Sequence, residues 1–150
     1  MTPARRTAAR RAVRRPRRPQ GFEPRPWGGF ENIVEGAGYK VKRLTVEPGH
    51  RISLQRHRFR AEHWVVVEGS PRVIVNGRAR RLTARGSIDV PRGAWHRIEN
   101  PGRRPVVIVE VQHGPYLGED DIIRRHDDYG RAAITPAKPA ARPRTVRKPR

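Results

Sequence analysis

The chain has 150 residues, no cysteine and a formal net charge of +20, with 34 Lys or Arg against 14 Asp or Glu. This length suits a single domain, and the absence of cysteine excludes both a disulfide framework and thiolate chemistry. No run of about 18 apolar residues marks a membrane span, and no apolar segment follows the charged N-terminus as in a secretory signal, so we expect a cytoplasmic protein.

The positive charge is concentrated at the two ends of the chain. Residues 1–20 contain eight Arg and no acid, and residues 132–150 contain six Lys or Arg, four Pro and no acid. Segments with so little apolar bulk cannot offset the entropy lost on ordering, so we expect two disordered tails around one domain at 21–131. The tails are either solvated extensions or electrostatic arms for nucleic acid or another polyanion, without aromatic residues for base stacking.

Between the tails, short β-rich runs alternate with turns that contain Gly or Pro. Asn76-Gly77 separates two such runs by two residues, which is a strong hairpin signal. Many short strands at this spacing predict an all-β sandwich or barrel. Only Glu119–His126 has the acidic first turn and basic later turn that suit a short helix. The expected strands are Phe30–Val34, Tyr39–Val46, Arg51–Arg56, His63–Glu68, Arg72–Val75, Arg78–Thr83, Ser87–Val90, Trp95–Glu99 and Val106–Gln112.

Four side chains in the middle of the chain have the chemistry of metal ligands. Gln55 and His57 are two residues apart, so on a strand they point to the same face. Glu62 opens the next expected strand, and His96 follows a Pro-x-Gly turn. Two imidazoles, a carboxylate and an amide oxygen suit a divalent metal with open positions for a substrate, and Zn²⁺ matches these ligand types best.

The spacing of these residues resembles the paired motifs of the cupin superfamily. Gly49–Gly69 follows the pattern Gly-x5-His-x-His-x4-Glu-x6-Gly, with Gln55 in place of the first His. Gly86–Asn100 follows the pattern Gly-x4-Pro-x-Gly-x2-His-x3-Asn. A Gln at this position is similar to the phosphomannose isomerases. The marks of their type II enzymes cover residues 24–131 and include Arg25-Pro26-Trp27-Gly28, Gln55-x-His57-x2-Arg60-x-Glu62-His63-Trp64, Glu110-Val111-Gln112 and Tyr116–Ile122.

The resemblance implies a cupin, that is, a double-stranded β-helix or jelly-roll barrel, with a short C-terminal helix. It also implies a homodimer that isomerises mannose 6-phosphate and fructose 6-phosphate for GDP-mannose and polysaccharide synthesis. Gln55, His57, Glu62 and His96 would hold Zn²⁺, with Co²⁺ or Mn²⁺ as alternatives. The competing hypothesis is a non-catalytic cupin that binds a sugar phosphate and regulates a partner enzyme. Type II enzymes usually carry a guanylyltransferase domain, but this chain has no Gly-rich phosphate loop, so we do not expect nucleotidyl transfer from it alone.

Two cationic side chains are expected to act on the substrate. Arg60 lies two residues before Glu62 and could share its inward face, where it would bind the phosphate or stabilise an enediolate. The alternative is a surface Arg in a turn. Lys42 shares a strand face with Leu44 and Val46, and an inward Lys is costly unless it is paired or functional. It is expected to be a substrate or base residue, or else a Lys at the barrel rim.

Other polar residues are expected to be structural. His63 falls on the opposite strand face to Glu62, which favours packing over metal binding. The acids at 119–121 are expected to be helix charge and not a second metal site.

Overall fold

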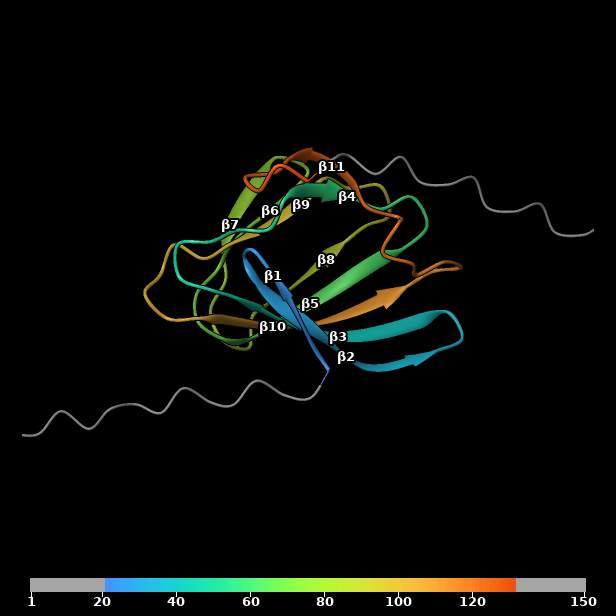
Figure 1. Ribbon diagram of the computed structural model, residues 1–150, viewed down its shortest axis with the longest axis horizontal. Coiled ribbons are helices and arrows are strands. Elements are labelled where there is room, and N and C mark those ends of the chain that lie inside the picture. Colours follow the sequence, from blue (N-terminus) through green and yellow to red (C-terminus); the bar gives the residue numbers. More distant parts are fainter. Residues whose placement is uncertain (1–20, 132–150) are drawn as a thin grey trace, which may run out of the picture.

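The computed structural model describes residues 21–131, which form two antiparallel β-sheets facing one another (Figure 1). The tails predicted to be disordered, 1–20 and 132–150, lie outside the described residues. Within the described span, no helix is long and apolar enough to cross a membrane. The strands are β1 (Phe22–Arg25), β2 (Gly28–Gly36), β3 (Tyr39–Val46), β4 (Leu54–Arg56), β5 (Ala61–Glu68), β6 (Arg72–Val75), β7 (Arg78–Arg81), β8 (Ser87–Val90), β9 (His96–Glu99), β10 (Val106–His113) and β11 (Ile123–His126).

The strand order confirms the predicted all-β jelly roll. One sheet has six strands in the order β1-β2-β3-β10-β5-β8, and the other has five in the order β11-β4-β9-β6-β7. The predicted bounds of β3, β6 and β8 are those of the structure, and the Asn76-Gly77 hairpin is confirmed by positive φ angles of 48° and 77°. Strand β1 was not predicted because its sequence, FEPR, has a single large apolar residue.

The helix predicted at Glu119–His126 is wrong. Its second half is strand β11, which pairs antiparallel with β4 and places Ile123 opposite Arg56. Favourable charge at a helix end contributes only about 0.3–1 kcal/mol. Pairing with the open edge of β4 satisfies several backbone groups and buries Ile122, which is 7% exposed, so tertiary contacts override the charge pattern.

Alternation along β3 and β10 divides the barrel interior into an apolar end and a polar end. The two strands pair antiparallel, so residues directly opposite one another point to the same face. The inward pairs Val106–Val46 and Ile108–Leu44 continue the hydrophobic core. The next two inward pairs are Glu110–Lys42 and Gln112–Lys40, all buried. The register of this strand pair therefore places a polar site at one end of the barrel.

Two glycines hold the N-terminal strands close to β3. Gly28 and Gly29 have φ angles of 140° and 146°, which residues with a side chain rarely adopt. A Cβ atom on Gly28 would lie 2.0 Å from the carbonyl oxygen of Thr45, so glycine is required for this approach. The neighbouring Trp27, 6% exposed, enters the core.

Candidate metal centre

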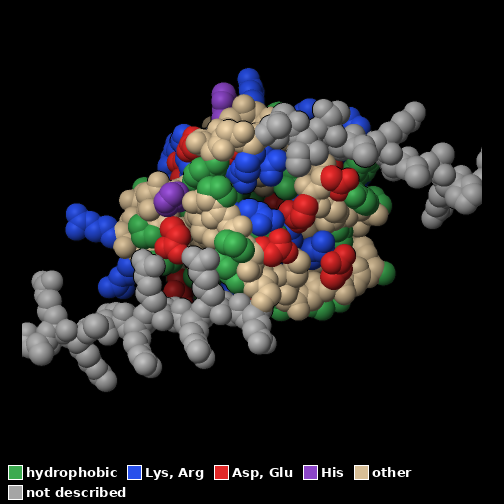
Figure 2. Space-filling view, viewed as in Figure 1, with side chains coloured by type: hydrophobic (Ala, Val, Ile, Leu, Met, Phe, Trp, Pro, Cys, Tyr) green, Lys and Arg blue, Asp and Glu red, His purple; other side chains and the backbone are tan. Residues whose placement is uncertain are grey.

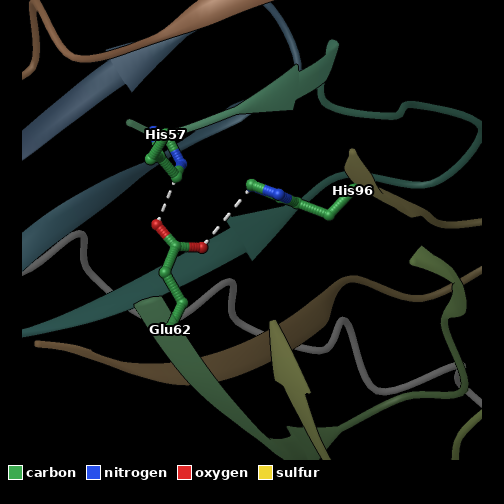
Figure 3. A group of neighbouring side chains, drawn as sticks. All are labelled: His57, Glu62 and His96. Atoms are coloured by element: carbon green, nitrogen blue, oxygen red, sulfur yellow. Dashed lines mark ion pairs between the residues drawn. The ribbon is translucent and has the colours of Figure 1, made fainter. Parts of the chain in front are cut away.

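His57, Glu62 and His96 converge at the polar end of the barrel (Figure 3). His57 follows β4, Glu62 is the second residue of β5, and His96 begins β9. One ligand atom from each of the three lies within 4.8 Å of the others. Nε2 of His57 is 3.0 Å from Oε1 of Glu62, and Nε2 of His96 is 3.6 Å from Oε2 of the same carboxylate. The structure therefore brings together three of the four predicted ligands.

Hydrogen bonds orient both imidazoles toward Glu62. Nδ1 of His57 lies 2.7 Å from the backbone carbonyl of Asp121, and Nδ1 of His96 lies 2.9 Å from that of Ala94. Each Nδ1 faces a carbonyl oxygen, which turns the Nε2 of that ring toward the carboxylate. Nε2 of His96 is buried and has no hydrogen-bond partner among residues 21–131. A buried imidazole nitrogen without a partner, next to a carboxylate and a second imidazole, fits the ligation of a divalent metal.

The electrostatics of the site keep its donors ready to bind a cation. Complete burial lowers the pKa of His96 to about 4, although Glu62 opposes this effect, so the ring is neutral at pH 7. Burial alone would raise the pKa of the Glu62 carboxyl, but His57, His96 and Arg60 lower it well below its usual range. An ionised Glu62 beside a neutral His96 is the state that metal ligation requires of these two residues.

Gln55 lies opposite His96 and faces the same cavity as Glu62. It is the cross-strand partner of His96 in the β4–β9 pair, so both side chains point to one face of the sheet. Gln55 lines the cavity together with Glu62, and its Oε1 accepts a hydrogen bond of 2.8 Å from the Ser53 hydroxyl. Its role as a fourth ligand remains a prediction.

Arg60 is buried beside the candidate ligands, so the alternative of a surface Arg is wrong. It is 3% exposed, and its Nε donates to Oε1 of Glu62 at 3.0 Å. Its two Nη atoms lie 3.1 Å from the carbonyl of Gly118 and 3.3 Å from Nε2 of His57. Burial alone would lower the pKa of Arg60, but the carboxylates around it, led by Glu62, raise it. A permanent cation therefore lies against the donor set.

Lys42 points into the cavity and is 3% exposed, which excludes a position at the rim. Its ammonium donates to the carboxylate of Glu119 and lies 4.1 Å from the centre of the Phe30 ring. The cavity wall therefore contains an ion pair with a buried Lys42, a partly exposed Glu119 and the Phe30 ring beside the ammonium.

Trp64 links Glu62 to a second buried carboxylate. Its Nε1 lies 3.2 Å from Oε2 of Glu62 and 3.1 Å from Oε2 of Glu110. Burial, and then the charge of Glu62, raise the pKa of Glu110 to about 7, while Lys42 opposes this rise. Nε2 of Gln112 donates to the other oxygen of Glu110 at 2.6 Å. Trp64, Glu110 and Gln112 therefore form a hydrogen-bonded network that holds the carboxylate of Glu62 in place.

The interpretation of the acids at 119–121 as helix charge is wrong. Asp121 is fully buried, and its carboxylate accepts from the backbone amides of Arg58 and Phe59 at 3.0 and 2.9 Å. Glu119 pairs with Lys42. The local sequence around Glu119 and Asp121 does not predict these contacts, because both residues interact with partners far away in the sequence. By contrast, His63 lies on the outer face as predicted and pairs with Asp89 at 2.7 Å.

A small cavity of about 60 Å³, open to solvent at its mouth, lies between the two sheets beside this site. In Figure 2, basic and acidic side chains alternate at the centre of the face shown. Arg25 of β1, Arg124 of β11 and Arg131 line the cavity. Nε of Arg124 is buried and has no partner among the described residues, while burial and the neighbouring charge of Arg131 lower its pKa. Clustered cations of this kind favour an anion at the mouth.

Comparison with known proteins places this geometry in a family. The mannose-6-phosphate isomerase C-terminal family matches residues 20–127. Over 107 residues the chain is 51% identical to mannose-1-phosphate guanylyltransferase ManC of Salmonella typhimurium, covering 71% of this chain and 22% of that protein. Over 109 residues it is 49% identical to the alginate biosynthesis protein AlgA of Pseudomonas aeruginosa, covering 73% and 23%. The chain thus spans about a fifth of the length of these curated relatives.

Solved structures show the same fold at low sequence identity. CapF of Staphylococcus aureus, a capsular polysaccharide assembling protein, aligns with a TM-score of 0.63 at 17% identity, covering 70% of this chain and 34% of that chain. The cupin domain of Schizosaccharomyces pombe Cnp3 aligns with a TM-score of 0.54 at 18% identity, covering 57% and 64%. The fold is therefore a cupin. Together with the family match over most of the chain, this shows that the protein belongs to the mannose-6-phosphate isomerase C-terminal family.

Proposed function

We propose that this domain is a metal-dependent aldose–ketose isomerase that interconverts mannose 6-phosphate and fructose 6-phosphate, feeding GDP-mannose and polysaccharide synthesis. The observation that carries the proposal is the convergence of His57, Glu62 and His96 beside a buried Arg60, with Glu62 and Arg60 lining an open cavity. A site that only bound a sugar phosphate would not need two imidazoles gathered around a carboxylate, with one imidazole nitrogen left without a partner among the described residues. Zn²⁺ suits these ligands best, with Co²⁺ or Mn²⁺ as alternatives.

The reaction moves a proton between C1 and C2 of the open-chain sugar and transfers the carbonyl in the opposite direction. When bound by His57, Glu62, His96 and Gln55, a divalent metal would supply the Lewis acid for the carbonyl oxygen. Arg60 would donate hydrogen bonds to the negative charge of the enediolate, because its guanidinium is buried and pre-oriented by Glu62 and Gly118. Lys42 would contact the substrate from the neighbouring wall of the cavity.

The phosphate would bind at the mouth of the cavity. Arg124 has a buried, unpartnered Nε there, and Arg25 and Arg131 lie close enough to influence its pKa. A phosphate neutralises such a cluster and accepts several hydrogen bonds from it. Arg60 would then be free to act on the reacting carbons, which makes the enediolate the better of its two predicted partners.

The second candidate function is a non-catalytic module that binds a sugar phosphate and regulates a partner enzyme. It is favoured by Arg25, Arg124 and Arg131 in the cavity wall, which suit a phosphate group whether or not a metal is bound. Both functions need the cationic mouth, but only the isomerase needs the metal donors for turnover.

A coupled assay of the purified chain separates the two candidates. The protein is freed of metal with a chelator, supplied with Zn²⁺, Co²⁺ or Mn²⁺, and given mannose 6-phosphate while fructose 6-phosphate is detected enzymatically. We expect turnover that depends on added metal and is absent from Glu62→Gln. Calorimetric binding of mannose 6-phosphate without turnover in any metal would favour the binding module instead.

A homodimer remains a prediction. On β10, Val107, Val109 and Val111 lie on the outer side of the six-stranded sheet and are only half-buried, and Val67 on β5 is 48% exposed. An antiparallel sheet that faces water normally alternates apolar with polar residues. We propose that a second copy covers this face, and light scattering that gives a monomer mass at micromolar concentration would contradict the proposal.

A further inference from the structure

The ion pair between Lys42 and Glu119 lies in the wall of the cavity. Lys42 is held in place by burial and by the Phe30 ring below its ammonium. Glu119 approaches from the segment before β11, and its side chain is 44% exposed, so a molecule in the cavity can reach it. A buried salt bridge is by itself weak evidence for a stabilising role. Because the carboxylate of Glu119 is partly exposed, this ion pair can form hydrogen bonds with a ligand in the cavity.

This pair shares the cavity wall with two other cations. Arg60 donates to the carbonyl of Gly118, the residue before Glu119, so the pair lies next to the metal-donor end, and Arg124 lines the same cavity. A hexose phosphate with C1 and C2 at the donor set and its phosphate at the mouth would place its middle carbons beside this pair. Those carbons carry hydroxyl groups, each of which can both donate and accept a hydrogen bond.

We propose that Lys42 and Glu119 together recognise the hydroxyl groups at C3 and C4 of the sugar phosphate and so determine which sugars are accepted. The ammonium of Lys42 offers only donors and the carboxylate of Glu119 only acceptors, so neighbouring hydroxyls satisfy both at once. This inference rests on the proposed isomerase function and adds a specificity-determining pair to it. The substrate class is a polyhydroxy aldehyde or ketone phosphate with hydroxyls between the carbonyl and phosphate ends.

The competing explanation is that Glu119 is an internal anion that occupies the place of the substrate phosphate on Lys42. The two explanations predict opposite effects of removing its charge. A hydroxyl-recognising carboxylate affects phosphate affinity only through its distant charge, which changes the affinity little. An internal competitor occupies Lys42 directly and weakens phosphate binding strongly until it is neutralised.

The test compares mannose 6-phosphate with its 3-deoxy and 4-deoxy analogues, using the metal-loaded full chain. We expect the wild type to prefer mannose 6-phosphate over at least one analogue by about 100-fold or more in kcat/KM, because a site built for a hydroxyl leaves polar groups unpaired without it. Glu119→Gln should reduce this preference to below about 10-fold, because the neutral amide forms weaker hydrogen bonds. Glu68→Gln, which changes an exposed carboxylate at the end of β5, is the matched control and should keep the wild-type preference.

Inorganic phosphate binding supplies the second measurement and does not need turnover. An unchanged dissociation constant in Glu119→Gln supports recognition of the hydroxyls, and a clearly tighter one overturns it in favour of the internal anion. Wild-type discrimination that persists in Glu119→Gln also overturns the inference while leaving the isomerase intact. By contrast, wild-type protein that binds phosphate but turns over no sugar would overturn the proposed function itself.

Discussion

Nδ1 of His57 and the backbone carbonyl of Asp121 lie 2.7 Å apart, so a candidate metal ligand is oriented by a residue 64 positions later in the chain. The carboxylate of the same Asp121 accepts from the amides of Arg58 and Phe59 and so holds the turn that follows His57. One buried residue therefore fixes both the ring and the backbone that carries it. Groups that orient metal ligands in this way commonly alter metal affinity when they are changed.

Replacing Asp121 with alanine should weaken metal binding by about 10- to 100-fold without abolishing it, because the carbonyl that accepts from His57 remains. Asp121→Asn keeps one acceptor oxygen and should recover part of the loss. Competition with a chromophoric chelator measures the affinity, and the visible spectrum of the Co²⁺ form reports ligand geometry. Asp120→Asn, at an exposed neighbouring position, is the control, and equal affinities in all of these proteins would show that Asp121 is not a positioning residue.

Loss of either imidazole should remove most of the metal. His57→Ala and His96→Ala each delete a ring nitrogen that faces Glu62, and imidazole is a strong ligand for Zn²⁺. Gln55→Ala should weaken binding less, because an amide oxygen is the poorer ligand. Metal content measured by elemental analysis after dialysis decides the point, with His63→Ala on the outer face as the control. Full occupancy in both inner variants would rule this site out.

Arg60 should matter for turnover more than for metal binding. Arg60→Ala is expected to lower kcat/KM by about 30- to 1000-fold, because it removes charge-assisted donors from the developing enediolate. Arg60→Lys should recover little, since an ammonium cannot reproduce the three directed contacts of the guanidinium. Kinetics, metal content and melting temperature are measured together, and wild-type kinetics in Arg60→Ala would contradict the assignment.

Arg124 should control the affinity for the phosphate group. Arg124→Ala is expected to raise both KM for mannose 6-phosphate and the inhibition constant of inorganic phosphate by about 10- to 100-fold, which corresponds to losing one charge-assisted contact. The value of kcat should change less than KM, because Arg124 is not among the groups proposed to contact the reacting carbons. Arg81→Ala removes an exposed Arg of β7 as the control. An unchanged phosphate inhibition constant would place the phosphate elsewhere.

Asp127 should stabilise the C-terminal end of the described domain only above acidic pH. Hydrogen bonds from the side chain of Arg131 hold the pKa of this carboxyl below its ordinary value. The stabilisation is therefore complete above the unfolded pKa of about 3.9 and is lost as pH falls through the lower folded pKa. Asp127→Asn should lower the melting temperature at pH 7, by an amount equivalent to no more than about 1 kcal/mol, and have little effect near pH 2. Equal destabilisation at both pH values would contradict this origin.

The sequence was sufficient to predict the fold and the three side chains that converge in it, because both depend on local spacing. Alternation along Tyr39–Val46 and the paired cupin motifs determine strand faces and ligand order, so His57, Glu62 and His96 could be named before any distance was known. The burial of Lys42 followed from the same alternation.

What the sequence could not predict depends on contacts between distant segments. Asp121 and Glu119 act through His57 and Lys42, more than 60 residues away, and no local pattern distinguishes such acids from those of a helix end. Arg124 lines the cavity because β11 pairs with the edge of β4, and no local pattern in the sequence predicts this pairing or a phosphate-binding role for Arg124. The positions of these three side chains are determined by interactions between strands and not by the preferences of single residues.

The close approach at Gly28 and Gly29 limits how this cavity can be redesigned. Arg25 and Trp27 are carried to the cavity on backbone that leaves no room for a side chain at either glycine, where a Cβ atom would lie 2.0 or 2.4 Å from a carbonyl oxygen. The charge and size of the mouth can therefore be altered through the side chain at position 25, whereas its location relative to β3 cannot be shifted by small steps. A designer who wants a wider entrance has to rebuild the strand pairing as a whole.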